Sequence, residues 1–493
     1  MMKLLVGVCF SLTSIIASAQ IGTGQWRLHM APKAIDIAVG NELVFAAFET
    51  GLVEYDPIEK QITQWTDVNS LSDIQVSSIH FDPHSAAFFV GYVNGNIDRI
   101  KDDQVTNIPA IKLASIQGSK RVNRFLSHNG LVYAATDLGI VVLDPIANEV
   151  KDTYYPSEPL DPITEVVIHA DTIYALTPRN LLRSNLSNTA LADVSQWSTD
   201  SRLSYQATNS YQRFFLWKDE LYTVIKTPVY GGDSLYRLSS NGLKNVINVP
   251  FDLEIENTTI SNDKLYLSVY DGVLVFNDQF EFTEVYNNFP SERPANVANA
   301  TELNGSIYIA DYNIGLIQFG INGYQILSPT GPPKNGFFAV NGAKNKISIA
   351  GGIINKASFT YSRSGAYVFE NEDWKLFDDS NQDLWLYDRV WDISSTSVNP
   401  NKTDQVAIGG YCMDPLFISD DGTNIGHIYN ELNSTLEKTT LGNGFICITD
   451  LQYDTRGNLW VVNGYADESL KVLTKDGVWK SFNTGVKSKE KYA

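Results

Sequence analysis

The chain has 493 residues and a mass of 54.8 kDa, too long for one typical domain. Hydrophobic residues make up 43% and charged residues 19%, which is a globular composition, and an aromatic content of 12% favours β structure. The formal net charge of −19 provides no basic surface at the level of the whole chain. We therefore expect no nucleic-acid partner.

Residues 1–19 have the features of a secretory signal peptide. Lys3 is the short positive region, Leu4 to Ile16 form the apolar stretch, and Ala17-Ser18-Ala19 supplies small residues before a cleavage site at Gln20. A lipoprotein signal ending at Cys9 is disfavoured, because the apolar run before it is too short. The sequence predicts an exported protein.

No later segment approaches the ~18 consecutive apolar residues of a membrane-spanning helix, so we expect no transmembrane span. After cleavage only Cys412 and Cys447 remain. They could form a disulfide in an oxidising compartment, or they could be two small buried apolar residues. The sequence leaves both alternatives open.

One pattern recurs along the chain: an apolar strand, a turn that often contains Gly, a second strand, and a polar hairpin. The clearest copies are LVFAAFETGLVEYD from Leu43, LVYAATDLGIVVLD from Leu131 and KLYLSVYDGVLVFND from Lys264. With weaker copies, the repeats begin at 43, 87, 131, 172, 221, 264 and 307, a mean spacing of about 44 residues.

Each repeat holds four short strand patterns separated by turn residues. In the first repeat the predicted strands are Ala34–Val39, Leu43–Phe48, Gly51–Tyr55 and Gln61–Trp65. Amphipathic helical periodicity of useful length is absent between the repeats. A four-stranded unit repeated every ~40–45 residues is typical of a β-propeller blade, so the sequence predicts an all-β fold.

Three further copies follow near Lys346, Gln405 and Asn458, after the linker-like stretch Ser328–Gly336. Ten blades exceed the usual four to eight of one ring. We therefore expect a seven-bladed β-propeller over residues 20–330, and the first three blades of a second, truncated propeller over residues 331–493. The outer strand of the seventh blade could be Gly24–His29 or Gly323–Leu327, and periodicity does not decide between them.

The sequence contains no recognisable catalytic, cofactor-binding or metal-binding motif. His80 and His84 flank a strand-end turn, so a shared metal is not expected. His128 and His169 occupy similar hairpin positions in neighbouring blades and could approach one another, although polar hairpin tips are the simpler interpretation. We therefore predict a non-enzymatic protein without cofactors, and no residue is assigned to a ligand or partner site.

Other polar and aromatic groups have ordinary structural interpretations. Asp420-Asp421-Gly422 and Lys101-Asp102-Asp103 are read as hairpin tips, and neither fits a calcium loop. Eight tryptophans could stack on sugars, but blade packing is the favoured use for most of them. They are Trp26, Trp65, Trp217, Trp374, Trp385, Trp391, Trp460 and Trp479.

Two family resemblances add to this interpretation. Ile448–Val462, which contains Asp454-Thr-Arg-Gly-Asn-Leu-Trp-Val, resembles the propeller repeat of periplasmic sensors in hybrid two-component regulators. The opening of the chain resembles the N-terminal propeller of the PorZ family of the type IX secretion system. The matching stretches are Gln25–Met30, Ala34–Val39, Gly51–Asp56 and Asn69–Asp73, with Val53 and Ser70 as minor departures.

The PorZ resemblance implies two seven-bladed propellers followed by a C-terminal domain of the cargo-signal type. It also implies a non-enzymatic role in the cell-surface attachment complex, together with a sortase and outer-membrane proteins. That complex removes C-terminal signals from cargo and links the cargo to anionic lipopolysaccharide. The expected location is the cell surface, associated with the outer membrane, with the periplasm as the route. The alternative function is the sensor region of a hybrid two-component regulator.

Overall fold

The computed structural model describes residues 28–485, except 204–209, 248, 250–251, 290–294, 321–322, 329–330, 333–336, 353–359, 362, 364, 372, 379–381, 383–389, 413–414 and 440–443. The described residues form ten four-stranded antiparallel sheets, in each of which consecutive strands pair with one another. The helical elements among them are the single turn α1 (Ala110–Leu113) and the 3-10 turn η2 (Val194–Gln196). Four-stranded antiparallel meanders are the units of a propeller, so the predicted all-β class is confirmed.

The sheets follow one another along the chain. The first four contain β1 (Ala34–Gly40), β2 (Leu43–Phe48), β3 (Gly51–Asp56), β4 (Gln61–Trp65); β5 (Val76–Asp82), β6 (Ala87–Tyr92), β7 (Ile97–Lys101), β8 (Gln104–Ile108); β9 (Val122–His128), β10 (Leu131–Thr136), β11 (Gly139–Asp144), β12 (Glu149–Tyr154); and β13 (Glu165–His169), β14 (Thr172–Leu176), β15 (Leu181–Asn185), β16 (Ser198–Thr199). The next three contain β17 (Ser210–Trp217), β18 (Glu220–Lys226), β19 (Ser234–Ser239), β20 (Gly242–Asn245); β21 (Ile255–Ser261), β22 (Lys264–Val269), β23 (Gly272–Phe276), β24 (Phe282–Tyr286); and β25 (Val297–Leu303), β26 (Ser306–Asp311), β27 (Gly315–Gly320), β28 (Gly323–Ile326). The last three contain β29 (Ala339–Ala343), β30 (Lys346–Ala350), β31 (Ala366–Glu370), β32 (Asp373–Phe377); β33 (Ile393–Val398), β34 (Val406–Gly410), β35 (Leu416–Ser419), β36 (Ile425–Tyr429); and β37 (Cys447–Tyr453), β38 (Leu459–Gly464), β39 (Leu470–Leu473), β40 (Trp479–Phe482).

The strand boundaries agree with the repeat pattern to within a residue. The second strands of the first seven sheets begin at Leu43, Ala87, Leu131, Thr172, Glu220, Lys264 and Ser306. The hairpins before them are tight turns with positive φ, for example at Asn41 (φ 50°) and Glu42 (φ 63°). Such turns match the right-handed twist of the two strands that they join, which is why Asn, Asp and Gly recur there.

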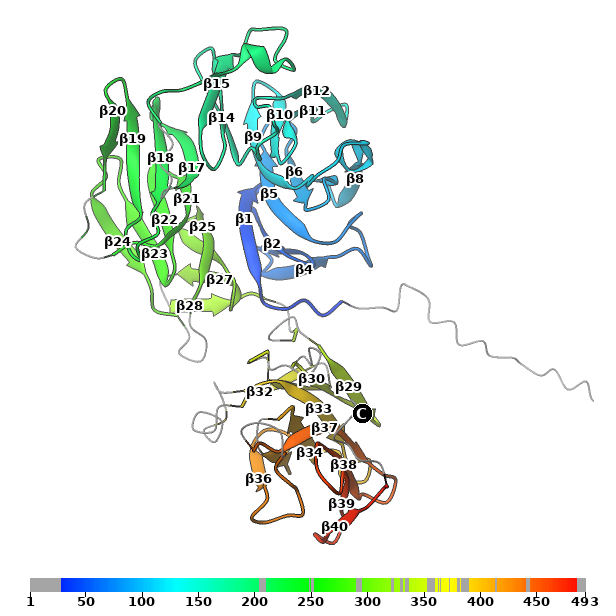
Figure 1. Ribbon diagram of the computed structural model, residues 1–493. Helices are drawn as coiled ribbons and strands as arrows, with labels where there is room; N and C mark the ends of the chain where they lie inside the picture. Colours follow the sequence, from blue (N-terminus) through cyan, green and yellow to red (C-terminus); the bar gives the residue numbers. More distant parts are fainter. Residues whose placement is uncertain are drawn as a thin grey trace, which may run out of the picture.

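The first strands of the first seven sheets contact one another in a closed sequence. β1 contacts β5, and the contacts continue through β9, β13, β17 and β21 to β25, which contacts β1 again. The first strands of the last three sheets contact in the order β29, β33, β37. Figure 1 shows the first seven sheets as one body and the last three as a second, smaller body beyond β28.

Apolar side chains fill the space between neighbouring sheets. The cluster between the first and second sheets includes Phe45, Trp65, Phe88 and Tyr92. The cluster between the seventh and first sheets includes Met30, Val44, Phe48, Tyr308 and Leu316. Both faces of the first sheet are therefore buried by its neighbours, as expected for repeats that cannot bury their faces alone.

A buried hydrogen-bond network joins the first and last of these seven sheets. The Asp36 carboxylate of β1 accepts hydrogen bonds from the Asn299 side-chain amide of β25 (2.8 Å) and from the backbone N–H of Ile79 in β5 (3.3 Å). It also accepts one from the N–H of Ile37 (3.0 Å). One carboxylate thus links three sheets across 263 positions of the chain.

The fourth strand of the seventh sheet is β28, from Gly323, which pairs with β27. Of the alternative segment, residues 24–27 lie outside the described residues, and Leu28 and His29 are not in a strand. The second of the two predicted alternatives is therefore the observed one.

In the last three sheets, Cys412 and Cys447 form a disulfide, which links the end of the β34 hairpin to β37. This decides between the two alternatives that the sequence left open.

We predict that Asn299→Ala destabilises the protein by about 1.5–3 kcal/mol, the usual contribution of a hydrogen bond to a buried charged group. Equilibrium urea denaturation would measure the change. Asn288→Ala removes an exposed side-chain amide and is the control. Equal stability of the two variants would contradict the role of the Asp36–Asn299 contact in closing the sequence of sheets.

Candidate functional site

A ring of polar side chains surrounds the central axis of the first seven sheets. Each comes from the first strand of its sheet and lies four residues before the end of that strand. We call this set the polar girdle: Asp36, Ser78, Arg124, Glu165, Arg213, Asn257 and Asn299. All are buried except Arg124, which is half-buried. Equivalent positions of seven neighbouring strands thus place seven polar groups around one axis.

The charged members of the girdle neutralise one another. Arg213 donates to the Glu165 carboxylate, and the Arg124 guanidinium lies 3.1 Å from the same carboxylate. Burial raises the pKa of Glu165, and the two guanidinium groups oppose this shift. Burial also lowers the pKa of Arg213 to about 10, which still leaves it charged at neutral pH. Since a buried charge is tolerated when it is paired and hydrogen-bonded, the girdle is a stable electrostatic unit.

The girdle lies between two cavities, and Asp36, Arg124, Glu165 and Arg213 contribute to the walls of both. The larger has a volume of about 860 Å³ and lies on the side where the first strands begin; we call it the entry cavity. The residue just before each girdle member lines it. These residues are Ile35, Ser77, Asn123, Thr164, Gln212, Glu256 and Ala298.

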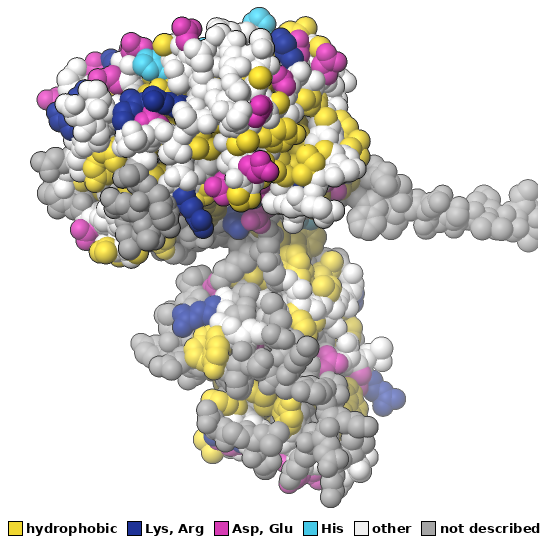
Figure 2. Space-filling model, turned by 45° about the horizontal axis from the view of Figure 1, so that its top comes forward, with side chains coloured by type: hydrophobic (Ala, Val, Ile, Leu, Met, Phe, Trp, Pro, Cys, Tyr) yellow, Lys and Arg dark blue, Asp and Glu magenta, His cyan; other side chains and the backbone are white. Residues whose placement is uncertain are grey.

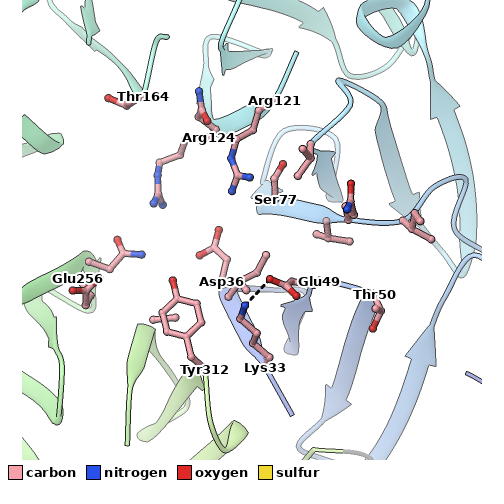
Figure 3. Close-up of a pocket in the computed structure, with 18 of the residues that line it drawn as sticks. Lys33, Asp36, Glu49, Thr50, Ser77, Arg121, Arg124, Thr164, Glu256 and Tyr312 are labelled. Atoms are coloured by element: carbon pink, nitrogen blue, oxygen red, sulfur yellow. Dashed lines mark hydrogen bonds and ion pairs between the residues drawn. The ribbon is translucent and has the colours of Figure 1, made fainter. Parts of the chain in front are cut away.

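A β-bulge explains why these side chains are aimed into the entry cavity. In six of the seven first strands the pairing register shifts at this position, the exception being β13. A bulge leaves one residue unpaired and redirects its side chain, and bulges are frequent next to functional sites. Figure 3 shows Arg121, Arg124, Asp36 and Tyr312 converging on the same space.

The second cavity, of about 600 Å³, lies on the opposite side of the girdle, and aromatic residues contribute to its wall. Phe81, Phe125 and Phe215 contribute to it, together with His80. The His80 ring nitrogen Nε2 lies 2.8 Å from Ser127 Oγ, and burial lowers the pKa of His80 to about 4. The imidazole is therefore neutral at physiological pH.

The His80–Ser127 pair does not have the arrangement of a nucleophile and its base. Ser127 also hydrogen-bonds to Asp82, so its hydroxyl belongs to a three-residue network. Among the described residues, no group of three or more His, Cys, Asp or Glu could hold a metal ion. The polar groups along the axis are suited to binding and to structural pairing.

The two histidine pairs of the sequence analysis are not brought together. His80 lies in β5 against Ser127, whereas the His84 imidazole lies near Gly130 in the next sheet. His169 lies 2.9 Å from Asp219, and His128 belongs to the wall of the second cavity. The hypothesis that His128 and His169 meet is therefore not supported.

The remaining sequence candidates have the expected structural roles. Asp421 accepts hydrogen bonds from the backbone N–H groups of Thr423 and Asn424 in a turn, and Asp102 lies in the β7–β8 turn with positive φ. Trp65 and Trp217 are buried, and the rings of Trp374, Trp391, Trp460 and Trp479 contact other aromatic rings. Trp26 and Trp385 lie outside the described residues. Among the described residues, no tryptophan lines the two cavities along the axis.

Sequence reasoning missed the polar girdle and the entry cavity. A signal was present, since the fourth residue before each hairpin is polar in all seven first strands. Alignment of the repeats on their hairpins rather than on their second strands would have revealed it.

We predict that Glu165→Gln destabilises the protein by about 3–5 kcal/mol, because it removes the ion-pair partner of the buried Arg213. Glu220→Gln is the matched control: Glu220 forms an exposed pair with Arg237 (2.9 Å), and breaking it should change stability by under ~1 kcal/mol. Urea denaturation of both variants is the measurement. A Glu165 variant as stable as the Glu220 variant would show that the girdle charges are not energetically coupled.

The comparisons with known proteins agree with this architecture. Residues 44–198 match the family model of the type IX secretion system PorZ N-terminal beta-propeller domain. No curated protein matches the chain in sequence. No helix in the described part of the chain is long and apolar enough to cross a membrane.

Among solved structures, the chain is similar to PorZ, an essential surface component of the type-IX secretion system of Porphyromonas gingivalis, with 18% identity and a TM-score of 0.76. The alignment covers 93% of this chain and 60% of that one, so the chain spans about three fifths of PorZ. The extracellular domain of BT4673 from B. thetaiotaomicron gives 12% identity and a TM-score of 0.33, covering 93% and 56% of the two chains. A TM-score of 0.33 is too low to support a conclusion about fold or function. The resemblance to the PorZ N-terminal β-propeller family is thereby confirmed, by the family model over residues 44–198 and by the shared fold.

Proposed function

We propose that this protein is a component of a type IX secretion system. The observation that carries the proposal is the family match over residues 44–198, in a chain whose fold follows that of PorZ over 93% of its length. PorZ is an essential surface component of such a system in Porphyromonas gingivalis. Because the sequence identity to PorZ is 18%, the functional proposal rests on the family match and not on the shared fold.

The proposed role is that of a non-enzymatic adaptor in the cell-surface attachment complex. It supports the sortase that processes C-terminal signals, and the anchoring of cargo to anionic lipopolysaccharide. Its partners are the sortase and outer-membrane proteins of that complex. In favour of a binding role, the charged girdle residues are engaged with each other, and they lie beside an entry cavity of about 860 Å³.

We further propose that the protein is exported and located at the cell surface, in association with the outer membrane. The predicted signal peptide, residues 1–19, lies outside the described residues. The disulfide between Cys412 and Cys447 is compatible with an oxidising, exported environment.

For domain organisation, we propose a seven-bladed propeller over residues 20–330 and the first three blades of a second propeller over residues 331–493. The closed sequence of contacts from β1 to β25 supports the first part. In the second part the strand contacts run from β29 through β33 to β37, and the Asn341 side-chain amide of β29 donates to Gln452 Oε1 of β37 (2.9 Å). Val340 of β29 is 67% exposed and Ile347 of β30 is 41% exposed, as expected where a sheet face lacks a neighbour.

A chain that ends at Thr330, a position outside the described residues, should fold alone with one cooperative transition. Its complement should be unstable or associate, because three sheets leave apolar faces uncovered. Circular dichroism melts and analytical ultracentrifugation of both fragments test this. A sharp monomeric transition of the complement would refute the seven-plus-three division.

The sensor alternative is supported only by the sequence of the β37–β38 hairpin, Asp454–Val461. It predicts altered transcription of target genes in a deletion strain, with normal processing of secreted cargo. The secretion role predicts the reverse, so one strain separates the two functions.

Deletion of the gene in its own bacterium should leave proteins with C-terminal sorting domains unprocessed or detached from the surface. Fractionation followed by mass spectrometry of their C-termini measures both effects. Complementation with the intact gene is the control. Normal cargo processing and anchoring would refute the secretion role and direct attention to transcript profiling.

A further inference from the structure

Three consecutive residues ahead of β1 contact three different parts of the molecule. Leu28 lies in the wall of the entry cavity. Met30 is 1% exposed and belongs to the apolar cluster between the seventh and first sheets. His29, which lies between them, contacts the second body. We call Leu28–Met30 the clasp segment, because it is anchored in the first body while its middle residue reaches the other.

The His29 ring packs against two aromatic rings of the β31–β32 hairpin. Its centroid lies 4.9 Å from that of Phe369 and 5.8 Å from that of Trp374, and both contacts are edge-to-face. The Trp374 indole Nε1–H also points to His29 Nδ1, at 3.5 Å. Edge-to-face packing is a favoured arrangement of aromatic rings, whereas 3.5 Å is long for a hydrogen bond. The ring contacts are therefore the main attraction at this point.

The two rings that receive His29 are held in place by their own sheet. Phe369 and Trp374 are directly opposite each other in the β31–β32 pairing, with ring centroids 4.8 Å apart. The Phe337 ring lies nearly parallel to that of Trp374, at 6.5 Å. Figure 1 shows this sheet as the part of the second body nearest to the start of β1, and Figure 2 shows hydrophobic side chains of the second body gathered close to the first. His29 therefore meets an aromatic surface that the hairpin builds by itself.

The connection between the two bodies passes the same segment. A Cβ atom added to Gly331 would lie 1.7 Å from the Met30 carbonyl oxygen, so only glycine allows the two backbones to approach this closely. Pro332, the next residue, is buried. The covalent connection and the His29 contact thus meet at one place. A short connection alone leaves two domains free to rotate relative to one another, and the His29 contact opposes that rotation.

We propose that the clasp segment fastens the second body to the first in one orientation, with His29 as the residue that closes the contact. The second body is thereby held on the side of the ring where the first strands begin, which is the side of the entry cavity. The proposal gives a role to His29, which belongs to the opening stretch Gln25–Met30 of the PorZ resemblance. It rests on these contacts and does not depend on the secretion role.

The test is a distance measurement in the intact protein between spin labels on the two bodies. Glu59→Cys in the β3–β4 turn and Leu432→Cys after β36 place the labels at exposed positions, and Cys412 and Cys447 are already joined. Double electron–electron resonance should give one narrow distance distribution. His29→Ala removes both ring contacts, so it should raise the population at other distances by about tenfold.

Two further variants make the result specific. His29→Phe keeps the ring and removes Nδ1, so the narrow distribution should remain. His84→Ala is the matched control, because it removes the same side chain from an exposed turn of the first body and should leave the distribution unchanged. Circular dichroism spectra equal to that of the unsubstituted protein would show that each variant is folded.

Three results would overturn the proposal: a broad distribution in the labelled protein with His29 intact, a narrow one in His29→Ala, or equal broadening in His84→Ala. A broad distribution in His29→Phe would overturn the assignment of the contact to the rings. None of these results bears on cargo processing in the deletion strain, so this proposal and the secretion role fail separately.

Discussion

The fold depends on the contact between β1 and β25, where the first and seventh sheets meet. A four-stranded sheet has two apolar faces, and each face is buried only by the sheet beside it. If the first and seventh sheets did not meet, two large faces would remain in water. The apolar cluster around Phe48 and Tyr308 supplies the driving force, and the Asp36–Asn299 hydrogen bond fixes the register in which the two ends meet.

The inner layer of the structure is polar because the first strands leave room around the axis. Side chains directed between the sheets, such as Val44 and Val90, are apolar and fully buried. Those directed toward the axis must be compatible with two cavities, so charged and amide groups are found there. Burial of Glu165 and Arg213 requires that they pair, and this pairing links the fourth and fifth sheets. The same constraint therefore shapes both the stability of the ring and the chemistry of its cavities.

Much of the fold could be predicted, because each hairpin is encoded locally. Asn41-Glu42, Asn262-Asp263 and similar turn pairs mark where a strand reverses, and the strands at Leu43 and Lys264 begin as predicted. The site could not be predicted in the same way, since its residues come from seven segments. Arg121 precedes the third sheet and Gln212 lies in the fifth, and they share a cavity because the sheets surround one axis. The disulfide was equally undecidable, since Cys412 and Cys447 are 35 positions apart in neighbouring sheets.

That disulfide has a consequence for how the second body responds to force and to reduction. It joins the sheets that begin with β33 and β37, so neither can separate from the other while the bond is intact. Closing a loop of this length removes unfolded-state entropy equivalent to about 3–4 kcal/mol. Unfolding of this body should therefore start at the sheet that begins with β29, which lacks a crosslink in the described residues. The crosslinked pair would remain as a compact template on which that sheet can re-form.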